Sequence, residues 1–353
     1  MNLKKNVLAV LSGEEVDVTP VISVTQIGIV EAMEKTDAFW PEAHKDAEKM
    51  AILGSSLYEL AGLECARIPF CLTVEAESMG CKVNLGSEDK TPLVVESPFQ
   101  NAVDIKIPKD FLHNGRIPVV LEAINKLKEK YGDNLPIIVG ITGPFTLTGH
   151  LLGVEKMVRY MRTKPNEIES ALDKAFEASI EYVNAISDIG PDIICVAEPN
   201  AATELINPLQ FKSIVKPRLE DLSSEINIKK VLHICGSSAP ILKDMASIGY
   251  DGLSVEEKVD VKWAKEELKG GGKIMRVGGR IMTMGGEKSP KLIGNISSSQ
   301  TLFRGSPDEV KEQAKDVLEA GVDILAPSCG LAPKSPLDNI KAMINGRNEF
   351  YSM

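Results

Sequence analysis

The stretch VLHICG at residues 231–236 is the clearest strand signal in the chain, because it joins a short apolar run to a glycine turn. Similar runs recur with amphipathic stretches between them, an alternation typical of βα units around a parallel sheet. Eight such runs predict an α/β fold, a closed (β/α)8 TIM barrel, because an open doubly wound sheet usually has only about five or six strands. The expected strands are residues 20–24, 65–69, 137–141, 192–197, 231–235, 252–255, 291–296 and 323–326.

Helical periodicity fills the intervals between these strands. It predicts an N-terminal helical segment around residues 7–11 and helices at 44–61, 166–189, 208–226 and 306–320. The last of these opens with Ser-Pro-Asp-Glu, which supplies an N-cap, a proline at the first helical position and two acids that favour the helix dipole. We expect residues 1–353 to form one barrel domain.

Two segments exceed a minimal barrel. Residues 73–109 alternate like short strands separated by glycine and proline, and they predict a β-hairpin excursion after the second strand. Residues 270–288 are rich in glycine and contain two apolar pieces that could pair as a hairpin. The piece at 273–277 competes with 291–296 for the seventh strand, and we prefer 291–296 because it leads into the capped helix at 306.

Composition narrows the function classes. Hydrophobic residues make up 43% of the chain and charged residues 25%, which is typical of a globular protein. The net charge of −10 disfavours nucleic-acid binding, which rewards clustered Lys and Arg. No apolar run reaches the roughly 18 residues of a membrane span, and six cysteines without a signal peptide favour a reducing cytoplasm.

The candidate metal ligands are His233, Cys235 and Cys329. His233 and Cys235 are two residues apart on one strand, so they share a face, and both lie at its carboxyl end. Cys329 follows the last strand, and barrel active sites form where these ends meet. An isolated H-x-C is more often core, but the three residues together predict a catalytic zinc site with an open fourth position.

Other polar residues near the strand ends have open alternatives. Glu198 is either a fourth ligand, a partner that orients His233, or a cap of the following turn. Ser237 and Ser238 either bind an anion at a helix start or simply cap it. Thr25, Gln26, Asn295 and Ser297 are expected to line the barrel mouth, whereas His150, Cys65, Cys71, Cys81 and Cys195 are assigned to packing.

Several motifs along the chain resemble a known family. They are LSGEEVDVTP (11–20), WPEAH (40–44), IPFCLTVEAESMGC (68–81), GITGPFTL (140–147), LHICG (232–236), DGLSVEEKVD (251–260), LIGNIS (292–297) and LAPSCGLAPKSPL (325–337). They are similar to the uroporphyrinogen decarboxylase superfamily, and more narrowly to its methylcobamide:coenzyme M methyltransferases. The resemblance implies a TIM barrel with zinc on His233, Cys235 and Cys329. It also implies methyl transfer, in methylotrophic methanogenesis, from a corrinoid carried by a partner protein to coenzyme M.

Three alternatives stay open beside this reading. A tetrapyrrole decarboxylase would need the family's arginine-rich segment after the first strand, and residues 24–28 contain no arginine. A protein that only docks a corrinoid protein, without activity, would not need all three metal ligands. In a third alternative, the enzyme transfers the methyl group to another thiol, such as homocysteine, and not to coenzyme M. Because no Arg or Lys adjoins the ligand motifs, the sulfonate of coenzyme M is expected near Ser237 or Ser238.

Overall fold

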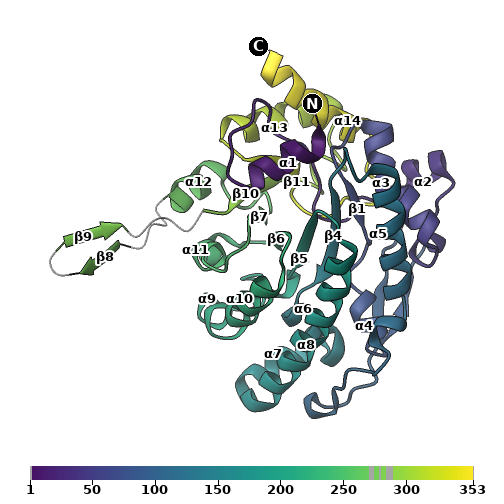
Figure 1. Cartoon of the computed structure of the whole chain (residues 1–353), viewed down its shortest axis with the longest axis vertical. Coiled ribbons are helices and arrows are strands. Elements are labelled where there is room, and N and C mark those ends of the chain that lie inside the picture. Colours follow the sequence, from purple (N-terminus) through teal and green to yellow (C-terminus); the bar gives the residue numbers. More distant parts are fainter. Residues whose placement is uncertain (1, 270–273, 278–279, 284–288, 353) are drawn as a thin grey trace.

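Seven parallel strands form one curled sheet in the computed structural model, which describes residues 2–269, 274–277, 280–283 and 289–352 (Figure 1). Their order is β1-β4-β5-β6-β7-β10-β11, so each strand follows its neighbour in sequence around the sheet. The α/β barrel predicted from the sequence is therefore confirmed. The strands are β1 (Ala66–Ile68), β4 (Ile137–Thr142), β5 (Ile193–Ala197), β6 (Lys229–Ile234), β7 (Gly252–Val255), β10 (Lys291–Ile296) and β11 (Ile324–Pro327).

The first expected strand, residues 20–24, is not a regular strand. It makes a single parallel bridge, between Val21 and Leu325 of β11. On its other side, one backbone hydrogen bond, from the Glu64 N–H to the Val21 carbonyl at 2.8 Å, stands beside two bonds to side chains. The Val21 N–H donates to the Glu64 carboxylate at 2.9 Å, and the Ser23 N–H donates to the Cys65 sulfur at 3.3 Å. The segment still lies between β11 and β1, so it closes the barrel without belonging to the sheet.

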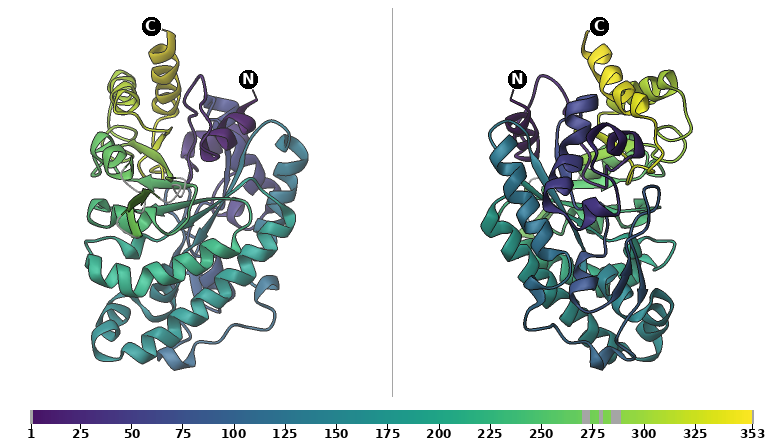
Figure 2. Two further views of the ribbon diagram at one scale, coloured as in Figure 1. Left: turned by 60° about the vertical axis from the view of Figure 1, so that its left-hand side comes forward. Right: turned by 90° about the vertical axis from the view of Figure 1, so that its right-hand side faces the viewer.

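Helices surround the sheet on its outer side (Figure 2). They are α1 (Leu3–Leu11), α2 (Val30–Thr36), α3 (Ala47–Ala61), α4 (Val74–Ser78), α5 (Ile117–Tyr131), α6 (Pro144–Leu152), α7 (Val154–Thr163), α8 (Pro165–Ile189), α9 (Pro208–Gln210), α10 (Lys216–Glu225), α11 (Leu242–Ala246), α12 (Val261–Lys269), α13 (Pro307–Glu319) and α14 (Leu337–Ser352). The described residues contain no helix long and apolar enough to cross a bilayer.

The helix expected at residues 208–226 is interrupted. After α9, residues Phe211–Val215 form a π-helical turn, and α10 begins at Lys216. Pro217 explains the widening, because a proline lacks the N–H that would bond back to residue 213 and its ring crowds that carbonyl.

Two hairpins extend from the barrel, as the sequence predicts. The first pairs β2 (Lys82–Asn84) with β3 (Leu93–Glu96) and follows the short helix α4. The second pairs β8 (Ile274–Val277) with β9 (Arg280–Thr283), and these strands pair only with each other. The seventh sheet strand is therefore β10, as preferred, while residues 270–273, 278–279 and 284–288 of the glycine-rich segment lie outside the described residues.

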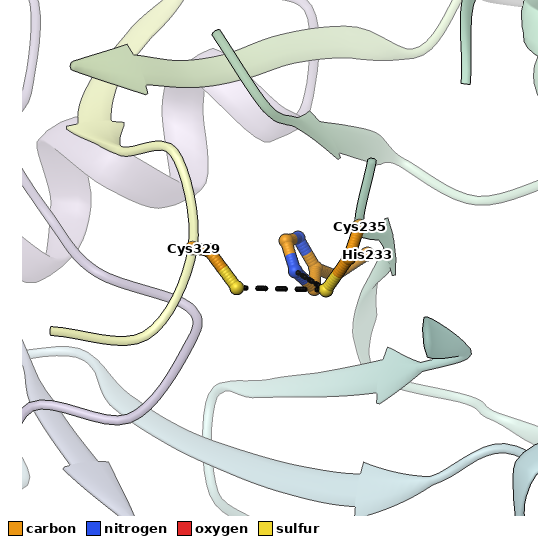
Figure 3. A group of neighbouring side chains, drawn as sticks. All are labelled: His233, Cys235 and Cys329. Carbon is orange, nitrogen blue, oxygen red and sulfur yellow. Dashed lines mark hydrogen bonds between the residues drawn. The ribbon is translucent and has the colours of Figure 1, made fainter. Parts of the chain in front are cut away.

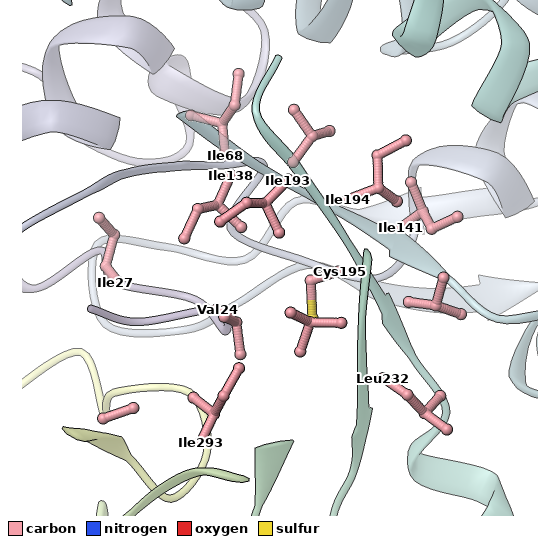
Figure 4. Packing of buried hydrophobic residues seen from close by; sticks show 14 of the residues in the cluster. Val24, Ile27, Ile68, Ile138, Ile141, Ile193, Ile194, Cys195, Leu232 and Ile293 are labelled. Carbon is pink, nitrogen blue, oxygen red and sulfur yellow. The ribbon is translucent and has the colours of Figure 1, made fainter. Parts of the chain in front are cut away.

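The core lies inside the sheet and between the sheet and its helices (Figure 4). β4 and β5 are buried along their whole lengths, since residues on both of their faces are covered. Fully buried examples are Ile138, Ile193 and Leu232. This packing fixes the carboxyl ends of the strands, where the candidate site lies.

Candidate metal centre and its cavity

Three side chains with metal-binding atoms meet at the carboxyl end of the barrel. His233 lies on β6, Cys235 follows the end of that strand, and Cys329 follows the end of β11. The Nε2 of His233 lies 3.1 Å from the Cys235 Sγ, which lies 3.5 Å from the Cys329 Sγ (Figure 3). All three ligand atoms lie within 4.8 Å of one another. The structure thus brings together the three residues that the sequence singles out.

The spacing of these atoms fits a tetrahedral zinc ion. Bonds of about 2.3 Å to sulfur and about 2.0 Å to nitrogen would set two sulfurs about 3.8 Å apart, and a sulfur and a nitrogen about 3.5 Å apart. The observed separations of 3.5 Å and 3.1 Å are slightly shorter, so only a small expansion of the cluster would admit the ion. Three protein ligands leave the fourth position open for a substrate.

Ser254 orients the histidine. Its hydroxyl lies 3.0 Å from the His233 Nδ1, and it stands directly beside His233 in the register of β6 and β7. This contact leaves Nε2 turned toward the cysteines, which is how proteins commonly fix a histidine ligand. Ser254 was not among the residues expected at the site, although a serine inside the buried run GLSV is a signal that could have identified it.

The two thiols of the cluster influence each other strongly. The hydrogen bond from Cys235 holds the pKa of Cys329 well below its ordinary value, and His233 adds to this effect. The same hydrogen bond and burial raise the pKa of the Cys235 thiol far above its ordinary value. Cys329 is therefore the more acidic thiol of the pair. A metal ion would favour the thiolate form of both.

Glu198 is not part of the cluster of ligand atoms. Its carboxylate accepts hydrogen bonds from the N–H groups of Phe145 at 2.9 Å and Thr146 at 2.8 Å, at the start of α6. Burial raises the pKa of this carboxyl to about 7. Of the three roles considered for Glu198, its contacts match the cap of a helix, although the helix is α6 and not the turn that follows Glu198.

The carboxylate that acts on the cluster is Glu256, which the sequence analysis did not consider. It follows the end of β7, next to the strand that carries His233. Burial and the charge of Cys329 raise the pKa of Glu256, while His233 opposes the shift. Its position directly after a sheet strand is the signal that could have identified it.

A cavity of about 300 Å³ opens over the cluster. Thr25 and Gln26 line it, as expected. The Gln26 amide is occupied, since its oxygen accepts from the Gly28 N–H at 2.5 Å and its nitrogen donates to the Leu331 carbonyl. Gln26 therefore holds the loop that follows Cys329.

The other proposed lining residues lie elsewhere. Asn295 is buried and donates to the carbonyls of Glu256 and Val259, at 2.9 and 2.8 Å. Ser237 and Ser238 are absent from the cavity wall. The Ser237 N–H is already bonded to the Glu204 carboxylate at 3.0 Å, which would repel an anion.

Further residues in the cavity wall change the assignments made from sequence. His150 and Cys71 line the cavity, so they are not purely core residues. Burial lowers the pKa of His150, so its ring is neutral at pH 7. Arg67 of β1 also lines the cavity and was not considered. An arginine within a buried strand is rare, and that rarity is the signal that was overlooked.

Comparison with known proteins agrees with this geometry. The family model for uroporphyrinogen decarboxylase (URO-D) matches residues 2–350. The methylcobamide:CoM methyltransferase MtaA of Methanosarcina barkeri is 45% identical over 99% of this chain and 98% of its own length. MtbA of Methanosarcina acetivorans, also a methylcobamide:CoM methyltransferase, is 33% identical over 97% and 96%.

A solved structure is equally close. It is described as a methyltransferase from Methanosarcina mazei, is 44% identical, and superposes with a TM-score of 0.92 over 99% of both chains. Similarity of this extent leaves no long segment of the barrel unmatched. The chain belongs to the uroporphyrinogen decarboxylase family, on the branch of its methylcobamide:CoM methyltransferases.

Proposed function

We propose that the protein transfers the methyl group of a methylated corrinoid to the thiol of coenzyme M, giving methyl-coenzyme M in methylotrophic methanogenesis. The observation that carries the proposal is the meeting of the His233, Cys235 and Cys329 ligand atoms within 4.8 Å beside a cavity. The relatives MtaA and MtbA are named for this reaction. We further propose that the donor methylcobamide is carried by a partner protein in the cytoplasm.

Zinc is the metal that best suits this donor set, and His233, Cys235 and Cys329 would hold it. The ion would supply acidity, because a free thiol with a pKa of about 8.5 is mostly protonated at pH 7 and a coordinated one is not. In the transfer, a sulfur–carbon bond forms as the cobalt–carbon bond breaks. The electron pair of that bond stays on cobalt, which passes from Co(III) to Co(I).

The chain's own residues position the reactants. Ser254 fixes the His233 ring, and Gln26 holds the loop after Cys329, so the three ligand atoms keep their relative places. The outer cavity wall is largely apolar and includes Leu93 and Val94 of the β2–β3 hairpin. An apolar wall limits water near the reacting sulfur and suits the flat, partly apolar face of a corrinoid.

The direct test is an assay of methylcobalamin demethylation with 2-mercaptoethanesulfonate, with zinc measured by elemental analysis on the same sample. We expect about one zinc per chain and formation of methyl-coenzyme M. The Cys235→Ala variant should lose most of both. Cys81→Ala is the matched control, because Cys81 is buried outside the cavity wall and should keep its zinc. Full zinc occupancy in both Cys235→Ala and Cys329→Ala would refute the assignment.

A second measurement tests how the thiol binds. We expect coenzyme M binding at pH 7 to release close to one proton, because the thiol enters protonated and must lose its proton to ligate the metal. Calorimetry in buffers of different ionisation enthalpy counts that proton. A count near zero in both the wild type and Glu256→Gln would contradict ligation, whereas a count restored by Glu256→Gln would identify Glu256 as the proton acceptor.

A further inference from the structure

Arg67 is the one permanently charged side chain among the described residues that line the cavity. It lies on β1, and only 2% of its surface is exposed. His233, Cys235 and Cys329 line the same cavity, so the guanidinium and the metal-ligand cluster face one space. Burial lowers the pKa of Arg67, yet a guanidinium remains protonated in proteins and brings a full positive charge to the cavity.

This charge has no carboxylate partner within residues 2–269, 274–277, 280–283 and 289–352, and the acidic groups that act on it are cysteine thiols, Cys329 among them. The other deeply buried arginines are paired, since Arg347 lies 2.6 Å from a carboxylate oxygen of Glu64, and Arg116 lies 2.5 Å from one of Glu77. Arg67 instead donates to two backbone carbonyls, those of Val24 and Pro69. A buried cation without a hydrogen-bonded anion is unfavourable, so an anionic ligand that accepts from the guanidinium would relieve a cost already built into the fold.

The third guanidinium nitrogen, Nη2, lies beside Gly140 of β4. A Cβ at position 140 would collide with this atom, so the glycine leaves the room that the guanidinium occupies. Among the described residues, Nη2 has no hydrogen bond or ion pair with another side chain or carbonyl. It therefore retains donors for a ligand in the cavity.

The distance from Nη2 to the metal-ligand cluster matches the length of a short thiol substrate. Gly140 is in register with Cys195, which is in register with Val231, two residues before His233. Two residues along a strand correspond to about 7 Å. A metal–sulfur bond of about 2.3 Å and a two-carbon bridge of about 4 Å cover nearly the same length. A sulfur at the metal would therefore place an acidic group near the guanidinium.

We propose that Arg67 binds the anionic tail of the methyl acceptor, so that the site selects thiols carrying an acidic group two carbons from the sulfur. The inference rests on the proposed function and adds the group that recognises the substrate. The tail points toward the barrel floor, which leaves the mouth free for the corrinoid. Arg67 would thus bind the sulfonate, the role that was expected of Ser237 or Ser238.

The test compares charged and neutral thiols on the same protein. Arg67→Gln should raise the KM for 2-mercaptoethanesulfonate by about 10- to 100-fold, the range expected for a lost hydrogen bond to a charged group. The KM for 2-mercaptoethanol should change little, because that thiol has no anionic tail. Arg67→Lys, which keeps the charge but not the fork of donors, should fall between the two. Equal losses with both thiols would overturn the proposal.

A binding measurement is independent of methyl transfer. Ethanesulfonate has the tail but no thiol, and calorimetry should detect its binding to the wild type and a large loss in Arg67→Gln. Gly140→Ala should weaken the same binding, because its Cβ displaces Nη2 without removing the charge. No binding of ethanesulfonate to the wild type would refute the role of Arg67, whatever the transfer assay shows. Binding without transfer would refute the proposed function instead.

The chemical kind of tail is settled by a second thiol. A sulfonate and a carboxylate can both accept two hydrogen bonds from a guanidinium. Comparison of 2-mercaptoethanesulfonate with 3-mercaptopropionate shows which one the cavity prefers. A lower KM for either charged thiol than for 2-mercaptoethanol, lost in Arg67→Gln, supports the proposal, while no advantage for either would contradict it.

Discussion

The His44 imidazole is fully buried, stacked on Trp40 with ring centroids 5.0 Å apart and packed edge-on against Phe70. Neither ring nitrogen has a hydrogen-bond partner among the described residues. Burial, aided by the charge of Arg116, lowers the pKa of His44 to about 3 from an ordinary value of 6.5. Protonation of this ring in the folded protein is therefore unfavourable, and the unfolded chain takes up the proton first.

This shift makes His44 a source of acid sensitivity. Because the folded pKa lies below the unfolded one, its contribution is fully present above pH 6.5 and is lost as the pH falls toward 3. The cost is about 1.4 kcal/mol per pH unit within that window. Urea unfolding at pH 7.5, 6 and 5 should show that His44→Leu loses less stability on acidification than the wild type. Equal losses of stability in the two proteins would show that the acid sensitivity comes from groups other than His44.

Single residues divide into those that a sequence pattern reveals and those that only contacts reveal. His233, Cys235 and Cys329 were predictable because cysteine and histidine are scarce and strand ends converge in a barrel. Ser254 and Arg67 were not, because their roles depend on the neighbour across the sheet or the space inside it. One sequence carries no record of which strand faces which.

Helix α13 begins with a capping box. The Ser306 N–H donates to the Glu309 carboxylate at 2.6 Å, and the Glu309 N–H donates back to the Ser306 hydroxyl at 3.4 Å. Ser306→Ala should lower the free energy of unfolding by about 1 kcal/mol, whereas Ser306→Gly should cost only a few tenths. Urea midpoints at constant slope measure the difference. Equal losses in the two variants would show that the cap contributes through the serine's packing.

At the scale of elements, hydrophobic periodicity predicted most strands and helices correctly. It did not predict the two places where a local contact or a proline changes the regular structure. Seven of the eight expected strands form, because short apolar runs between amphipathic helices are best buried as strands of the central sheet. Residues 20–24 fail as a strand because side chains of Glu64 and Cys65 take the hydrogen bonds that a ladder would use. The helix at 208–226 widens because Pro217 cannot donate, an effect readable from sequence but easily outweighed by the strong periodicity around it.

At the seam of the barrel, a buried ion pair adds to the backbone hydrogen bonds that residues 20–22 make with Leu325 and Glu64. Arg347 of α14 contacts Glu64 at 2.6 Å and donates to the Thr19 carbonyl at 2.6 Å, and Glu64 in turn accepts the Val21 N–H. These contacts connect the last helix, the closing segment and Glu64, which lies two positions before β1. The pair therefore strengthens a seam at which the backbone ladder is short.

Breaking this pair should destabilise the entire fold. Glu64→Gln leaves the Arg347 charge buried and unpaired, which should cost about 3–5 kcal/mol in the free energy of unfolding. Glu349→Gln is the control, because its ion pairs with Lys311 and Lys315 are exposed and should leave stability nearly unchanged. A small loss in Glu64→Gln would show that the barrel closes through its apolar core alone.

The separation of the proposed metal ligands along the chain would have a consequence for biosynthesis. Cys329 follows Cys235 by 94 residues, so it leaves the ribosome about 5 to 20 seconds later at ordinary synthesis rates. A nascent chain that stops short of β11 would contain His233 and Cys235 but not the third proposed ligand. Capture of a metal ion by all three ligands would therefore have to wait until the last strand of the barrel has been made.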